Sequence, residues 1–142
     1  MFITGATAIA LGGCARLDGR AALRTLVLRL PPASRRVFWE RVQGYATQNH
    51  LTSAVVPQSP RTARSFAFLL QGRGLEVSGH NNAYDPLQPD DYAVRFYSAP
   101  VFGAGRIMID RFADAFRDTM LSENGVRLIA DSGPIPESKM AK

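Results

Sequence analysis

The stretch FAFLLQGRGLEVS, residues 66–78, decides the fold. Two apolar runs, 66–70 and 75–78, flank the short loop Gln71-Gly72-Arg73-Gly74, and this pattern predicts a β-hairpin. In the following segment DYAVRFYS, residues 91–98, apolar and polar side chains alternate, which predicts a half-buried strand that stops before Pro100. The middle of the chain therefore indicates an antiparallel sheet.

Two segments on either side of these strands have helical spacing. In residues 34–49 (SRRVFWERVQGYATQN) the apolar positions Phe38, Val42 and Tyr45 share one helix face. Between residues 105 and 123 a second apolar stripe is expected to face the core, opposite a charged side that carries Asp110 and Asp114. The stripe consists of Met108, Phe112, Ala115, Phe116, Thr119 and Met120, with Ile109 at its edge.

Shorter apolar runs at 23–30, 53–56 and 126–131 predict the remaining strands. The resulting element order is strand, helix, strands, strand, helix, strand. It favours the α+β class, a two-layer sandwich with two helices on a mostly antiparallel sheet. A ferredoxin-like arrangement with an extra hairpin fits this order. We assign residues 23–131 to this single domain and residues 132–142 to a flexible tail.

Composition and charge exclude several classes of protein. A chain of 142 residues that is 46% hydrophobic and 20% charged fits one globular domain and excludes a multi-domain machine. The net charge is +5, but the arginines are spread along the chain from Arg16 to Arg127 rather than clustered. Binding of nucleic acid needs a concentrated basic face, and the aromatic run of RNA-binding domains is missing, so we expect no nucleic-acid partner.

The N-terminal segment MFITGATAIALGG, residues 1–13, contains no charged residue and is too short to span a bilayer, which takes about 20 apolar residues. It is followed by the only cysteine of the chain, Cys14. The sequence Leu11-Gly12-Gly13-Cys14 resembles the lipobox of bacterial lipoproteins, in which an aliphatic residue and two small ones precede the cysteine. Small residues leave a peptidase access to the backbone, and the thiolate is the nucleophile that lipidation requires.

The resemblance implies a processing route and an address. Residues 1–13 would be a signal peptide, Cys14 the lipidated N-terminus, and residues 14–22 the lipidated cysteine with a tether. The partner implied is a membrane, reached through the acyl chains on Cys14, because several chains on one residue anchor a protein firmly. Ala15 follows the cysteine where an aspartate would favour the inner membrane. The implied location is therefore the outer membrane of the cell envelope, facing the periplasm.

One segment could carry chemistry in the domain itself. Residues 79–91 (GHNNAYDPLQPDD) are rich in turn-forming residues and predict a loop. Histidine is the ordinary base near neutral pH, so this loop is the candidate ligand or partner site. Its candidate residues are His80, Asn81, Asn82, Tyr84 and Asp85. Turn geometry alone also explains most of these residues, and their spacing matches no metal site, so we assign no catalytic residue, no metal and no cofactor.

Three functions remain open from the sequence. The first is a small lipid-anchored envelope protein without enzymatic activity, which binds another protein or acts as an accessory subunit. The second is a periplasm-facing immunity-type protein that neutralises a toxin, an analogy at the level of architecture. The third is a small-ligand binder or enzyme that uses His80 with Asp85 or Asp90.

Overall fold

Six β-strands form one sheet in the computed structural model of the chain, which describes residues 21–56, 67–81, 90–122 and 125–132. Neighbouring strands run antiparallel throughout, in the order β2-β3-β4-β5-β1-β6. The elements in chain order are β1 (Arg24–Arg29), the 3₁₀ turn η1 (Pro32–Ser34), α2 (Arg35–Gln48), β2 (Thr52–Val56), β3 (Ala67–Gly72), β4 (Leu75–Asn81), β5 (Asp91–Ser98), α3 (Arg106–Leu121) and β6 (Arg127–Asp131).

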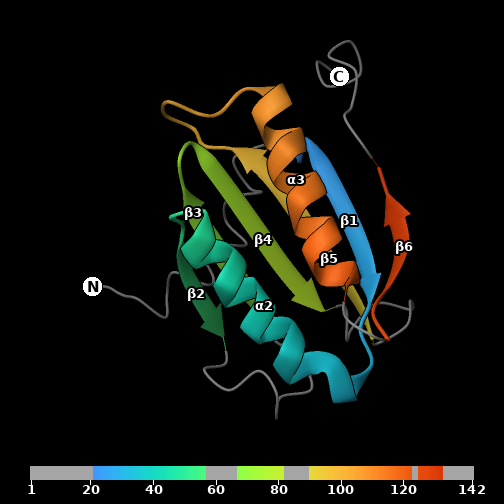
Figure 1. Cartoon of the computed structure of the whole chain (residues 1–142). Coiled ribbons are helices and arrows are strands. Elements are labelled where there is room, and N and C mark those ends of the chain that lie inside the picture. The colour runs from blue at the N-terminus through green and yellow to red at the C-terminus, as the bar shows by residue number, and fades with distance from the viewer. Residues whose placement is uncertain (1–20, 57–66, 82–89, 123–124, 133–142) are drawn as a thin grey trace.

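The predicted α+β two-layer architecture is confirmed, because both helices lie on the same face of the sheet (Figure 1). Strands β4, β5, β1 and β6 follow one another in the order of a ferredoxin-like sheet, and β2 and β3 extend that sheet beyond β4. Helix α2 connects β1 to β2, and these two strands are separated in the sheet by three others. Among the described strands, any two that run parallel are therefore separated by at least one other strand.

The core forms where alternate strand residues meet the two helices. In β1, Leu26 and Leu28 are fully buried, whereas Thr25 and Val27, which alternate with them, are half-buried. The predicted stripe of α2 faces the same core. Other strands and both helices contribute Phe68, Leu70, Leu75, Val77, Val94, Phe96, Phe38, Val42, Tyr45, Ile109, Phe116 and Met120.

Residues 79–81 belong to a strand, so the prediction that they open a loop is wrong. β4 continues to Asn81, and His80 pairs with Ala67 of β3 on one side and with Ala93 of β5 on the other. Gly79 suggests a turn in the sequence, but it is needed for packing, because a Cβ at this position would collide with the ring of Phe68. Two neighbouring strands thus override the local preference of the sequence for a turn.

Helix α3 is rotated relative to the predicted stripe. Its buried residues are Ile109, Phe112, Ala113, Phe116 and Met120. Met108 and Ala115, which the stripe placed in the core, are exposed. The rotation brings Asp110 and Asp114 toward the buried guanidinium of Arg24 in β1, an interaction that helical spacing alone does not reveal. Among the helices of the described segments, none combines the length and apolarity needed to cross a membrane.

Candidate functional site

Large apolar side chains are exposed at the end of the sheet where β5 connects to α3. Val101 is 69%, Phe102 97% and Ile107 73% exposed, and Met108 in the first turn of α3 is 40% exposed. We call these four residues the apolar end. A group of exposed apolar side chains on an otherwise polar domain marks a surface that meets a partner or a membrane.

The loop that carries Val101 and Phe102 is held firmly in place. The carbonyl oxygen of Gly74, in the β3–β4 turn, accepts hydrogen bonds from the backbone N–H of Ala99 (2.9 Å) and of Ala104 (2.8 Å). The Ser98 hydroxyl donates to the carbonyl oxygen of Ala104 at 2.8 Å. A Cβ at Gly103 would collide with Ser98 Oγ and the backbone of Ala99, so only glycine fits there. The apolar end is therefore presented on an ordered support.

Phe102 is exposed in an unfavourable backbone conformation. Its φ angle is 52°, in the left-handed region. For a residue with a side chain that conformation costs roughly 1–2 kcal/mol, and asparagine tolerates it better than phenylalanine does. The ring recovers none of this cost by burial within the chain, because 97% of its surface is exposed. Strain of this kind, retained where it does not stabilise the fold, is typical of residues kept for function.

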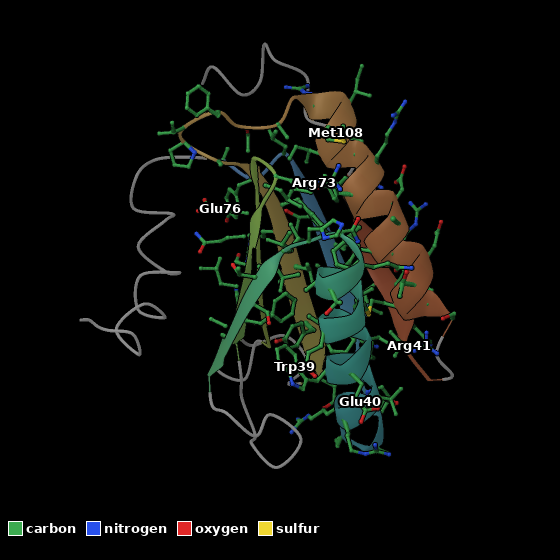
Figure 2. The ribbon with its side chains drawn as sticks, turned by 60° about the vertical axis from the view of Figure 1, so that its left-hand side comes forward. Trp39, Glu40, Arg41, Arg73, Glu76 and Met108 are labelled. Carbon is green, nitrogen blue, oxygen red and sulfur yellow. The ribbon has the colours of Figure 1, made fainter. Side chains whose placement is uncertain are left out.

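Arginines lie beside the helical part of the apolar end. Arg73 in the β3–β4 turn and Arg111 on α3 are exposed, and Arg106 begins α3. The guanidinium of Arg73 lies 5.4 Å from the centre of the Phe112 ring, a cation–π contact that fixes its position. Figure 2 shows Arg73 beside the start of α3, close to Met108.

No carboxylate occurs in the sequence between Asp91 and Asp110, and the connection from β5 to α3, residues 99–105, carries no charged residue.

The sequence-predicted site gives a different picture. His80 lies on β4, half-buried on the sheet face away from the helices, and its Nε2 is 2.8 Å from Nη1 of Arg95. A guanidinium only donates hydrogen bonds, so Nε2 must accept, and the ring is the neutral tautomer with its proton on Nδ1. This nitrogen is therefore engaged rather than available as a base or as a metal ligand.

The other predicted site residues are only partly described. Asn81 is the last residue of β4. Asn82, Tyr84, Asp85 and the lipidation candidate Cys14 lie outside the described residues. The structure therefore brings His80 together with Arg95, a pairing between neighbouring strands that the sequence analysis did not consider.

An open groove between α2 and α3 is floored by Val37, Gly44 and Tyr45, but Tyr45 is already satisfied because its hydroxyl donates to the Phe112 carbonyl oxygen at 2.9 Å. Burial raises the pKa of that hydroxyl, so it stays protonated at neutral pH. Within the described segments no group of three or more His, Cys, Asp or Glu side chains is placed to hold a metal ion.

The largest ionic cluster has a structural role. Arg24, 5% exposed, binds Asp131 of β6 through Nε (2.7 Å) and Nη2 (2.9 Å), and also Asp110 (3.1 Å) and Asp114 (2.7 Å) of α3. These hydrogen bonds and charges raise the pKa of the guanidinium further above its ordinary value. Each of the three guanidinium nitrogens donates to a carboxylate, so the cluster ties α3 to the edge of the sheet.

Sequence reasoning missed the apolar end, although it left a trace. Val101 and Phe102 stand between Pro100 and Gly103, where turn chemistry favours small or polar side chains. A bulky pair in such a loop cannot be explained by turn geometry.

No protein-family model matches the chain, and no curated protein matches it.

Proposed function

We propose that this protein is a lipid-anchored component of the bacterial cell envelope that binds a partner and has no catalytic role. The observation that carries the proposal is the sequence Leu11-Gly12-Gly13-Cys14, which supplies the only thiol in the chain at the position that bacterial lipoproteins acylate. The short spacing between Cys14 and the domain supports the proposal.

An anchor at Cys14 would keep the domain close to the membrane. Arg24, the first residue of β1, lies ten positions after Cys14, and an extended chain of ten residues spans at most about 35 Å. Helix α3, with 16 residues, is about 24 Å long. The domain would therefore stay within little more than its own length of the bilayer, where envelope partners are within reach.

The edge strand β6 supports a protein-binding role. Four of its five residues are exposed, including Leu128 and Ile129, and it is paired with β1 on one side only among the described strands. The free edge of a sheet offers backbone N–H and C=O groups to an extended segment of a partner, and exposed apolar side chains add contact area. An immunity-type role is one specific form of this proposal, and it predicts that deletion of the gene removes protection in a competition assay.

The ligand-binding alternative centred on His80 has less support. Nε2 of His80 accepts a hydrogen bond from Arg95, so the ring is poorly placed to take a proton from a substrate.

Metabolic labelling with a radioactive fatty acid tests the proposal. The full-length chain, expressed in a Gram-negative host, is expected to incorporate label, and Cys14→Ala is expected to abolish it. Ala21→Ser, an exposed substitution just before β1, is the matched control and should keep the label. Absence of label on the wild type, or equal label on Cys14→Ala, would overturn the proposal.

A further inference from the structure

We propose that the apolar end, formed by Val101, Phe102, Ile107 and Met108, inserts into an anionic lipid surface and fixes the orientation of the domain on the membrane. The anchoring proposed above provides the setting for this inference. Binding of lipid by the apolar end is nevertheless a property of the folded domain, and it is measurable without acylation.

The apolar end lies close to the point where the N-terminal segment joins the domain. The N–H of Leu23 donates to the carbonyl oxygen of Phe96 at 2.8 Å, and Arg24 pairs with Phe96 in the register. The chain therefore joins the domain two residues from Ser98, where β5 ends and the loop to the apolar end begins. Figure 1 shows the start of β1 and the start of α3 at the same end of the molecule. A tether from the membrane thus reaches the domain at its apolar end.

Exposed apolar side chains and exposed arginines occur together at this end of the domain. Aromatic and aliphatic side chains that enter the interfacial region of a bilayer gain from leaving water, and arginines beside them bind anionic headgroups. Phe102, Val101 and Ile107 provide the first kind of contact. Arg73 and Arg111 provide the second, and the connection between β5 and α3 adds no carboxylate that would repel the headgroups.

The loop that carries Val101 and Phe102 is held in place by the β3–β4 turn before any lipid is bound. Because Gly74 holds both Ala99 and Ala104, insertion would not require the loop to be ordered first. Preorganisation of this kind reduces the entropy lost on binding. It also explains why the strained conformation of Phe102 is retained, since that conformation points the ring away from the domain.

The experiment uses the full chain carrying Cys14→Ala, so that no acyl group contributes. Sedimentation with vesicles of phosphatidylcholine alone, and of phosphatidylcholine mixed with phosphatidylglycerol, measures binding. We expect preferential binding to the mixed vesicles, weakened by salt because the headgroup contacts are ionic. Phe102→Asn should reduce the affinity at least about tenfold. Asparagine tolerates the left-handed conformation, so this variant should unfold at a temperature no lower than the parent.

Two matched controls distinguish vesicle binding by the apolar end from non-specific adsorption of the protein. Ile129→Asn removes an exposed apolar side chain from β6, and it should change the affinity by less than about twofold. Arg111→Gln should weaken binding to the mixed vesicles, whereas Arg36→Gln, on the exposed Arg36–Glu40 pair of α2, should not. Equal binding by Phe102→Asn and the parent, or equal losses in Phe102→Asn and Ile129→Asn, would overturn the proposal.

Insertion itself is observed with a reporter at residue 102. In a chain that also carries Trp39→Phe, so that the reporter is the single tryptophan, Phe102→Trp should show a blue shift of its fluorescence and quenching by brominated lipids in mixed vesicles, and Ile129→Trp should show neither. No blue shift at residue 102 would contradict insertion, even if residues 1–13 held the chain on the vesicle. A dimer in solution that Phe102→Asn dissociates would instead assign the apolar end to a second copy of the chain. The labelling of Cys14 is independent of all these outcomes, so each proposal can fail alone.

Discussion

Replacement of Arg24 by methionine is expected to destabilise the domain strongly. Methionine keeps most of the length of the side chain and removes its charge. In the wild type the guanidinium binds both carboxylate oxygens of Asp131, at 2.7 and 2.9 Å, and one oxygen each of Asp110 and Asp114. The substitution would leave these three carboxylates close together around an apolar side chain.

The loss in the free energy of unfolding depends on how well water hydrates the three carboxylates once the guanidinium is gone. Removing one partner of a buried ion pair costs about 3–5 kcal/mol. Here the side chains of Asp131, Asp110 and Asp114 are 19%, 24% and 50% exposed, and Arg117 still binds Asp131 at 3.1 Å. Partial hydration and the remaining arginine reduce the expected loss to about 2–4 kcal/mol. At about 4 °C per kcal/mol for a domain of this size, the Tm should fall by roughly 8–16 °C.

Urea unfolding followed by circular dichroism measures this loss, and an unchanged dependence on urea concentration would show that the same surface unfolds. Arg36→Met is the matched control, because Arg36 pairs with Glu40 at 2.9 Å with both side chains more than half exposed. It should cost no more than about 0.5 kcal/mol. If Arg24→Met lost no more stability than Arg36→Met, the cluster would not tie α3 to the sheet.

Three further predictions concern single side chains. Burial raises the pKa of Tyr45, so the unfolded state loses this proton first, and Tyr45 should contribute about 1.4 kcal/mol per pH unit to a fall in the free energy of unfolding above about pH 10, to which the buried Tyr92 also contributes. Tyr45→Phe should flatten that fall in urea unfolding at several pH values, and an unchanged slope would exclude the cause. Gly79→Ala should cost about 1–3 kcal/mol in thermal unfolding, because the new methyl displaces the Phe68 ring, and the double variant with Phe68→Leu should recover part of it. Nitrogen chemical shifts should show His80 protonated on Nδ1, and Arg95→Leu should change that tautomer ratio; an Nε2–H tautomer in the wild type would contradict the assigned hydrogen bond.

Most of the architecture could be predicted because local patterns and tertiary packing agree. The hairpin turn at Arg73-Gly74 follows from glycines between two apolar runs, and both residues have positive φ angles there. The spacing of Phe38, Val42 and Tyr45 places α2 correctly on the core. Where these signals coincide, the sequence determines both the element and its buried face.

The errors occur where distant residues decide the outcome. Arg24 shares the inward face of β1 with Leu26 and Leu28, so alternation indicates its burial. Its carboxylate partners, however, are 86 to 107 residues away in the sequence. The ion pairs of Asp110 and Asp114 with Arg24 hold α3 in a rotation that leaves Met108 exposed. The composition of residues 79–81 predicts a loop. Their pairing with β3 and β5 depends on residues outside this segment, so the local sequence does not reveal it.

The candidate site was harder to predict than the fold. His80 was selected for its chemistry, but the structure joins it to Arg95 across neighbouring strands. The apolar end is defined by exposure, and exposure depends on what the rest of the chain leaves uncovered. The sequence does not reveal that Phe102 combines a left-handed φ angle with an exposed ring.

Lipidation at Cys14 is tested by the mass of the N-terminal peptide of the mature protein, purified from bacterial membranes. We expect that peptide to begin at Cys14 and to carry the added mass of acyl chains on that residue. A mature protein that retains residues 1–13, or that carries a free thiol at Cys14, would contradict it.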